Sequence, residues 1–255
     1  MSAPVFPDLE GASVFITGGG SGIGAALSEG FLRQGAKVAF VGQSDASAFV
    51  DRMAAETGNR PLFIKCDITD TAALKAAMDQ TASAHGPITV LINNAANDKR
   101  HATDEVDEAF WDWSIAINLK AYFFACQTVL PAMQAAGGGV IINMSSVSYM
   151  MGNAGYPIYT TANAGITGMT RSLAREFGPH GVRVNALAPG WVMTEKQKEL
   201  WVTPEALDEQ LSRQCVKTPL EPCDMVGPVL FLASDASRAI TGQLIAADGG
   251  VVVTG

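Results

Sequence analysis

The sequence predicts a single α/β domain, built on a doubly wound parallel sheet with helices on both faces. Short apolar runs rich in β-branched residues alternate with longer stretches of helical periodicity along the chain. This alternation is typical of right-handed crossovers between parallel strands. A glycine cluster directly follows the first apolar run. The length of 255 residues suits one such domain, and no linker, repeat or low-complexity segment divides it.

The predicted elements follow one another in a regular order. The first strand covers residues 14–17 and ends at glycines, as a buried parallel strand does. Apolar positions then recur at helical spacing until Gly35 ends the first helix. Further strands are expected at 37–42, 62–66, 88–92, 139–144, 182–187 and 243–247. Helices are expected near 70–85, 107–136, 157–178 and 223–234.

Residues 191–222 contain Trp191 and Trp201 but few strand signals, so we expect a helical excursion from the sheet. Ligands of open α/β sheets bind at the carboxyl ends of the strands, and an insertion after the sixth strand would therefore cover the site as a lid. The alternative is a surface pair of helices with two buried tryptophans. The predicted organisation is one domain over 1–255 with a lid near 191–222.

The composition argues against several classes of function. The net charge is −8 and no run of Lys and Arg exceeds two residues, which disfavours a surface for nucleic acid or an anionic membrane. No window approaches the ~18 consecutive apolar residues of a membrane-spanning helix. The N-terminal segment lacks a basic region followed by a long apolar stretch, so we expect no signal peptide and a cytoplasmic protein.

Cysteines and histidines show no pattern of a metal or redox site. The four cysteines are far apart and form no C-x-x-C pair, which predicts reduced thiols: Cys66, Cys126, Cys215 and Cys223. The three histidines have no ligand spacing between them: His85, His101 and His180. We therefore expect no metal site.

The segment TGGGSGIG at 17–24 joins the first predicted strand to the first predicted helix. Glycines let the backbone turn sharply and approach a ligand closely. The helix N-terminus behind them presents free N–H groups and a positive dipole end. The spacing differs from the commoner G-x-G-x-x-G fingerprint. Its position between an apolar strand and an amphipathic helix nevertheless favours a dinucleotide site over a purely structural turn.

The sequence resembles the short-chain dehydrogenase/reductase family over essentially its whole length. The family's cofactor motif T-G-x-x-x-G-I-G stands at 17–24, and its other motifs follow in the correct order. They are Asp67, the NNAA segment at 93–96, Asn118, Ser145-Ser146, Tyr159, Pro189-Gly190 and the DGG segment at 248–250. The resemblance implies a Rossmann-like fold and an oxidoreductase that uses NAD or NADP.

By position, the resemblance assigns the cofactor contacts to the glycine loop and to residues that follow the strands. They are Gly18, Ser21, Gly22, Ile23, Gly24, Gln43, Ser44, Asp67, Ile68, Asn94, Ala95, Ala96, Tyr159, Asn163, Pro189, Gly190, Val192 and Thr194.

The choice between NAD and NADP depends on the end of the second strand. In the family, an acidic residue there selects NAD, and a basic residue there or in the glycine loop selects NADP. Here Gly42 occupies that position, and no Arg or Lys stands in 17–24 or 42–45. Gln43 and Ser44 can hydrogen-bond either cofactor. Asp45 can act as the acidic residue that selects NAD if the loop curls back, although a solvated aspartate is the alternative. Lacking a cation, the sequence favours NAD over NADP.

Tyr159 and Asn163 are four residues apart and lie on one face of the predicted helix. The resemblance makes Tyr159 the general acid/base that exchanges a proton with the substrate oxygen while hydride moves to or from the nicotinamide. It makes Ser146 the hydrogen-bond partner of that oxygen, since Ser145 fits the serine-to-tyrosine interval less well. It makes Asn118 the anchor of a relay water.

In the family a lysine stands at the position of Asn163, where its charge lowers the pKa of the tyrosine. A free phenol has a pKa near ~10, and each unit of pKa is worth about 1.4 kcal/mol, or about tenfold in the ionised population. Asn163 brings no charge, so we expect a rate lower by one to several orders of magnitude.

Three interpretations of Asn163 stay open at this stage. In the first, Asn163 is an engineered or variant residue in an otherwise active enzyme. This interpretation is favoured because the other catalytic positions are all intact. Alternatively, the protein is naturally impaired or uses another cation, such as Arg100 or Lys120. Finally, catalysis is lost and only dinucleotide binding remains, as in a regulatory or scaffold protein.

The segment NDKRH at 97–101 suits a polyhydroxylated or anionic substrate, although a solvated loop is the alternative. Together with 194–205, it resembles the family's bacterial aldose 1-dehydrogenases, which oxidise a sugar hemiacetal to a lactone. The second candidate is a reductase or dehydrogenase that acts on another carbonyl compound, such as a keto-deoxy sugar acid or a 3-oxoacyl thioester. The expected substrate contacts are Asn97, Arg100, Ser146, Tyr156, Tyr159 and Trp191. The resemblance also implies a homotetramer in which the helices near 107–136 and 157–178 pack across a dimer interface.

Overall fold

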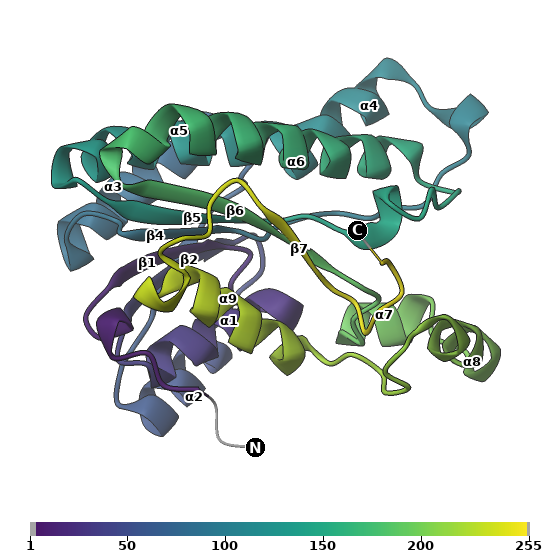
Figure 1. Cartoon of the computed structure of the whole chain (residues 1–255), viewed down its shortest axis with the longest axis horizontal. Helices are drawn as coiled ribbons and strands as arrows, with labels where there is room; N and C mark the ends of the chain where they lie inside the picture. The colour runs from purple at the N-terminus through teal and green to yellow at the C-terminus, as the bar shows by residue number, and fades with distance from the viewer. Residues whose placement is uncertain (1–3, 254–255) are drawn as a thin grey trace.

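The fold is a parallel β-sheet between two layers of helices, seen in a computed structural model that describes residues 4–253 (Figure 1). The predicted domain boundaries at 1 and 255 lie outside the described residues. The sheet has seven strands in the order β3-β2-β1-β4-β5-β6-β7, and all neighbours are parallel. The strands are β1 Ser13–Thr17, β2 Lys37–Gly42, β3 Leu62–Lys65, β4 Val90–Asn93, β5 Gly139–Met144, β6 Val182–Pro189 and β7 Leu244–Ala247. The predicted doubly wound parallel sheet is confirmed.

Helices cover both faces of the sheet, and each layer buries its own apolar cluster. One layer contains α1 (Gly22–Arg33), α2 (Ser47–Thr57) and α9 (Val226–Ala233). The other contains α3 (Thr71–His85), α5 (Ala121–Ala136) and α6 (Pro157–Phe177) (Figure 1). Short 3-10 turns lie at Pro7–Leu9, Thr103–Glu105, Val147–Tyr149, Gly178–His180, Pro222–Met225 and Asp235–Ser237.

Helix α2 was not predicted from the sequence, because its own residues carry weak signals. Its N-cap residue, Ala46, makes no side-chain capping bond. What holds it is tertiary packing, since Val50 and Met53 are buried in the same cluster as Phe40 of β2. Packing of this kind routinely outweighs local propensity.

The predicted helix over 107–136 is not one regular helix. It consists of α4 (Glu108–Ile115), a π-helical turn at Ala116–Lys120, and α5. The buried Asn118 lies inside the π-helical turn. Single π-helical turns are rare and concentrate at functional sites, so this irregularity marks the position that the sequence pattern assigned to the site.

Residues Glu108–Ala136 form the one helical run of the described chain that is long and apolar enough, by length and composition, to cross a membrane. In the structure this run contributes Tyr122, Ala125, Cys126 and Val129 to the buried interior. A core helix of an α/β domain passes the same test, and the packing against the sheet is that of a core helix.

The strand order reverses between β1 and β4, which lie side by side although two strands separate them in sequence. A reversal of this kind opens a crevice at the carboxyl ends of the strands, where ligands of such folds bind. The glycine loop follows β1, and the loop after β4 begins at Asn94. The topology therefore brings two of the predicted site segments to one edge of the sheet.

The excursion predicted at 191–222 is confirmed as helical and lies beside that edge (Figure 1). It contains α7 (Glu195–Leu200) and α8 (Pro204–Arg213). Its two ends are joined by a bridge between Val192 and Leu220, where the Met193 N–H donates to the Leu220 carbonyl at 2.7 Å. The alternative with two buried tryptophans is wrong, because Trp201 is 40% exposed.

Candidate active site

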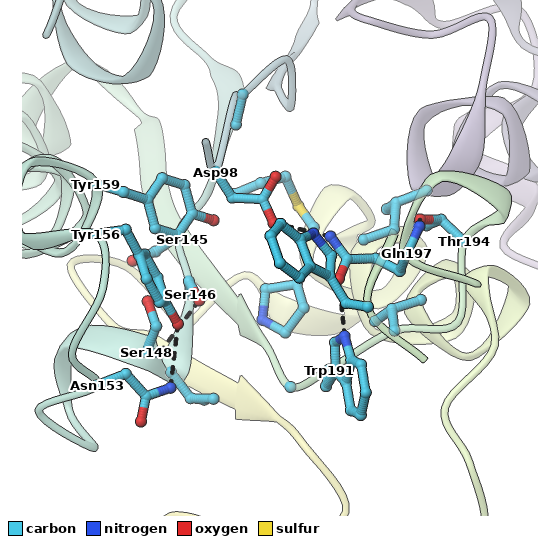
Figure 2. A pocket seen from close by; sticks show the side chains of 18 of the residues that line it. Asp98, Ser145, Ser146, Ser148, Asn153, Tyr156, Tyr159, Trp191, Thr194 and Gln197 are labelled. Carbon is cyan, nitrogen blue, oxygen red and sulfur yellow. Dashed lines mark hydrogen bonds between the residues drawn. The ribbon is translucent and has the colours of Figure 1, made fainter. Parts of the chain in front are cut away.

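A cavity of about 480 Å³ opens at the carboxyl ends of the strands, between the loops after β4, β5 and β6 and the helical excursion at 191–222, for which we keep the name lid from the prediction (Figure 2). Most of the predicted substrate contacts line it: Arg100, Ser146, Tyr156, Tyr159 and Trp191. Seven other residues assigned to the cofactor also line it: Ile23, Asn94, Ala96, Pro189, Gly190, Val192 and Thr194. One cavity thus contains members of both sets of predicted residues.

The glycine loop has the geometry that a phosphate site requires. Gly18 and Gly22 have φ of +68° and +52°, a region that residues with a side chain rarely adopt. A Cβ on Gly24 would lie 2.0 Å from the Gly18 carbonyl oxygen, so only glycine fits there. Ser21, the N-cap residue of α1, makes no side-chain capping bond and leaves the first N–H groups of the helix open. These features fit an anionic pyrophosphate.

Two of the predicted cofactor residues hold the glycine loop in place. The Thr17 hydroxyl accepts from the backbone N–H groups of Asn94 at 2.9 Å and Ala95 at 3.0 Å. The Asn94 side-chain amide donates back to the carbonyls of Thr17 at 3.0 Å and Gly18 at 3.2 Å. The end of β4 therefore fixes the turn that follows β1.

Four predicted cofactor contacts lie outside the cavity, at the ends of β2 and β3: Gln43, Ser44, Asp67 and Ile68. The Asp67 carboxylate accepts from the Thr69 N–H at 2.9 Å and hydroxyl at 2.7 Å, and these bonds hold the pKa of Asp67 below its usual value, with Gln43 contributing in the same direction. Ser44 is exposed and Ile68 is buried. One cation that the sequence analysis missed is also here, because strand pairing places Lys65 directly beside Gly42.

Tyr159 lies in the cavity wall near the start of α6, with its ring 5.4 Å from that of Tyr156. Burial, and to a smaller extent the Asp98 carboxylate, raises the pKa of Tyr159 to about 12. The Ser146 hydroxyl and the Asn163 amide lower this pKa but do not offset the burial. At pH 7 the phenol is therefore almost wholly protonated, with about one part in 10⁵ ionised.

The two serines after β5 have different roles. The Ser146 hydroxyl accepts from the Ser148 N–H at 3.1 Å, which leaves its own proton free to point into the cavity. The Ser145 hydroxyl instead donates to the Asn163 carbonyl at 3.2 Å and ties β5 to α6. This division supports the prediction that Ser146 is the functional serine.

Asn118 acts on the loop after β4 and does not line the cavity. Its side-chain carbonyl accepts from the Asn97 N–H at 2.8 Å, and its amide donates to the Asn97 carbonyl at 3.0 Å. Asn97, predicted as a substrate contact, is not among the residues that line the cavity. Its side-chain oxygen accepts from the Lys99 N–H at 3.0 Å and closes a local turn.

Asn163 is 2% exposed and its side chain is used within the helix. Its amide donates to the Tyr159 carbonyl at 2.9 Å, four residues back.

Among the alternative cations, Lys120 is exposed and does not line the cavity, whereas Arg100 does. The Arg100 guanidinium stacks over the Tyr156 ring at 3.7 Å and faces the lid residue Trp201 at 5.4 Å. No positive charge occupies the position of Asn163 itself.

Several cavity residues were not among the predicted site residues. Ser148 has a buried hydroxyl without a hydrogen-bond partner among the described residues, and Asn153 donates to the Tyr156 hydroxyl at 3.1 Å (Figure 2). Asp98, Lys196 and Gln197 bring further polar groups from the loop after β4 and from the lid. Only tertiary contacts identify them, although Asp98 lies in the polar segment that the sequence indicated.

No group of three or more His, Cys, Asp or Glu residues in residues 4–253 forms a candidate metal site.

The fold, the glycine loop and the Ser146–Tyr159 pair define the class of protein. A family model described as Enoyl-(Acyl carrier protein) reductase matches residues 18–252. The chain belongs to the short-chain dehydrogenase/reductase family and is an NAD(P)-dependent oxidoreductase of that family.

Similar proteins cover nearly the whole chain. A probable galactose dehydrogenase of Rhizobium meliloti (strain 1021) is 49% identical over 248 residues, which are 96% of this chain and 97% of that protein. The D-xylose 1-dehydrogenase of Caulobacter vibrioides (strain NA1000 / CB15N) is 43% identical over 251 residues, 98% of this chain and 99% of that one. A solved structure of a blue fluorescent protein from a metagenomic library, in complex with NADPH, superposes with a TM-score of 0.88 at 32% identity and covers 96% of this chain and 100% of that one.

Proposed function

We propose that this protein oxidises an aldose at C1 to the lactone, with a nicotinamide dinucleotide as hydride acceptor. The observation that carries the proposal is the position of Ser146 and Tyr159 in the wall of a polar cavity beside the glycine loop. Further hydroxyl and amide groups in that wall, such as Ser148 and Asn153, are of the kind that bind sugar hydroxyls. The two similar proteins named as sugar dehydrogenases support the same substrate class.

In this proposal the residues of the chain handle the proton and the orientation of the sugar. The glycine loop and the loop after β4 would hold the dinucleotide, which would serve as acceptor of the C1 hydride. The Ser146 hydroxyl donates a hydrogen bond to the anomeric oxygen and holds it near Tyr159. The Tyr159 oxygen takes the proton of that hydroxyl as general base. Asn118 keeps the loop after β4 in position through its two bonds to the Asn97 backbone.

Asn163 makes the enzyme slow in this proposal but does not change its reaction. Asn118 lies in the π-helical turn, Ser146 precedes the 3-10 turn at Val147–Tyr149 and Tyr159 lies in α6. Asn163 fits the helix without a charge, because its amide donates to the Tyr159 carbonyl. This supports an active enzyme with a substituted residue over a protein that only binds dinucleotide.

A turnover screen separates these functions. NAD and NADP binding is measured by fluorescence, and the protein and its Asn163→Lys variant are then supplied with neutral aldoses, keto-deoxy sugar acids and 3-oxoacyl thioesters. Cofactor reduction with an aldose and release of a lactone supports the proposal. Tight cofactor binding without turnover of any substrate by either protein contradicts it and supports a binding protein.

We further propose that NAD is preferred and that Asp45 contributes to the preference. Asp45 is exposed on the loop after β2, and its bonds from the Ser47 hydroxyl at 2.6 Å and N–H at 3.1 Å lower its pKa, so it is charged at neutral pH. A negative charge there disfavours a 2′-phosphate. The nearby Lys65 side chain, which also lowers the pKa of Asp45, partly offsets this effect.

Asp45→Asn is therefore expected to raise the NADP-to-NAD ratio of kcat/KM by about two- to fivefold, a range set by the screening of exposed charges. Lys65→Gln is expected to lower the same ratio. Steady-state kinetics with both cofactors measure it, and Asp51→Asn, an exposed acid of α2, is the matched control. An unmodified protein that already prefers NADP contradicts the proposed preference.

A cytoplasmic homotetramer is also part of the proposal. The α4–α5 region exposes Trp111, Trp113 and Phe123, with exposed fractions of 44%, 37% and 44%. Large apolar side chains gathered on one region are typical of an interface between copies. Light scattering of the purified protein measures the assembly, and a monomer at micromolar concentration contradicts this part.

A further inference from the structure

The lid is joined to the loop after β4 by one carboxylate. Asp98 accepts from the Lys196 ammonium at 2.9 Å through one oxygen and from the Gln197 amide at 2.8 Å through the other. Gln197 in turn accepts from the Trp191 ring N–H at 2.8 Å (Figure 2). Both donors to Asp98 belong to α7, so these contacts join α7 to the loop after β4. The Asp98 side chain is 21% exposed, which reduces the screening of its charge by water.

The same carboxylate lies near the catalytic tyrosine. Figure 2 shows the Asp98 carboxylate and the Tyr159 hydroxyl directed into the same space, and both line the cavity. Its negative charge is the second contribution, after burial, that raises the pKa of Tyr159. With Asn163 uncharged, position 163 supplies no positive charge to oppose it. An unpaired Asp98 would therefore make proton uptake by Tyr159 harder.

Of the cations in the cavity wall, only Lys196 contacts Asp98. Arg213 forms an ion pair with Glu209 on α8, and Arg100 stacks on Tyr156. Lys196 forms an ion pair with Asp98. Two further titratable neighbours are Tyr156, which packs against the ring of Tyr159, and the buried Tyr122, whose pKa is raised by burial and by Tyr159. The effect of the Asp98 charge on Tyr159 therefore depends on whether Lys196 is paired with Asp98.

We propose that Lys196 is a positioning residue of the reaction, which neutralises Asp98 when the lid closes and so allows Tyr159 to accept the proton of the substrate. The proposal rests on the proposed function of Tyr159 as general base. It assigns the lid an electrostatic role in addition to covering the cavity. Closure over a substrate would then favour proton transfer in the closed state only.

The test uses two substitutions that are expected to act in opposite directions. A base is active when deprotonated, so below its pKa the activity rises about tenfold per pH unit, and a lower pKa gives more activity at a fixed pH. Lys196→Gln leaves Asp98 charged and is expected to lower kcat/KM about three- to tenfold between pH 7 and 9. Asp98→Asn removes the charge and is expected to leave kcat/KM equal or up to about tenfold higher.

The double variant decides between an electrostatic and a purely structural role. In the Asp98→Asn background, Lys196→Gln is expected to have no further effect, because no charge remains for Lys196 to neutralise. With Asp98 unchanged, Lys196→Arg is expected to keep most of the activity that Lys196→Gln loses. The matched control is Lys198→Gln, also on α7, whose partners Glu195 and Glu221 are outside the cavity wall. Equal losses in Asp98→Asn and Lys196→Gln, or additive losses in the double variant, overturn the proposal.

A second readout does not require turnover. Tyrosinate absorbance is titrated for each variant and for its Tyr159→Phe counterpart, and the difference isolates the ionisation of Tyr159. Asp98→Asn is expected to move this ionisation to lower pH, with thermal melting confirming that each variant is folded. A shift to lower pH in a protein that oxidises no aldose would support the charge coupling and reject the proposed function. No shift in Asp98→Asn overturns the coupling even if aldoses are oxidised.

Discussion

Asn163→Lys is expected to raise kcat/KM at pH 7 by about 10- to 1,000-fold. A lysine at this position lies one helical turn from Tyr159 on the same face, and an opposite charge at such a distance lowers a pKa by about one to three units. The pKa of Tyr159 is now held at about 12. Each unit by which it falls multiplies the ionised fraction by about ten, until chemistry is no longer rate-limiting.

The control for this prediction is Asn163→Gln, which lengthens the side chain without adding charge. Because Asn163 is buried, both variants also change packing, and their melting temperatures are compared with that of the unmodified protein. The pH dependence of kcat/KM is measured for all three. A lysine variant that is no faster than the glutamine variant at any pH contradicts the assignment of Asn163 as the limiting position.

Tyr159→Phe is expected to abolish most of the remaining activity. General acid/base catalysis contributes about 10²- to 10⁴-fold, and phenylalanine keeps the ring but removes the group that takes the proton. In the present sequence the loss is expected near the lower end, about 100-fold, because Tyr159 is poorly ionised to begin with. In the Asn163→Lys background the loss is expected near the upper end.

The loss of kcat/KM on Tyr159→Phe is therefore measured both with Asn163 and in the Asn163→Lys variant. Two residues that act together give non-additive losses. Tyr156→Phe is the comparison, because Tyr156 lies in the same cavity and makes one hydrogen bond, from Asn153 at 3.1 Å. Loss of one neutral hydrogen bond corresponds to about a two- to twelvefold decrease. If Tyr156→Phe is the more damaging change, the roles of the two tyrosines are reversed.

Local chemistry was enough to predict much of the fold and of the site. Apolar runs between glycines gave the strand positions, because a buried parallel strand has to be apolar throughout. The glycine loop was readable because left-handed backbone at Gly18 and Gly22 and the contact at Gly24 leave few other residue types. Tyr159 and Asn163 could be placed on one face because helical spacing is a local property.

The errors and omissions all concern contacts between segments distant in sequence. Helix α2 is held by packing on β2. Asp98 and Lys196 are 98 residues apart, and no spacing rule relates them. Lys65 was missed as a neighbour of Gly42 because strand pairing, not sequence, brings them together.

The sequence by itself determined the sheet and helix layers, the glycine loop and the missing charge at Asn163, and its family motifs indicated Tyr159 and Ser146 as candidate catalytic residues. These depend on residue type, on periodicity and on short spacings, which a chain carries before it folds. The tertiary structure alone decided what surrounds Tyr159: the burial that raises its pKa, the Asp98 carboxylate and the lid lysine that pairs with it. Electrostatic effects depend on distance in space and on exclusion of water, and both arise only when the lid and the strand ends come together.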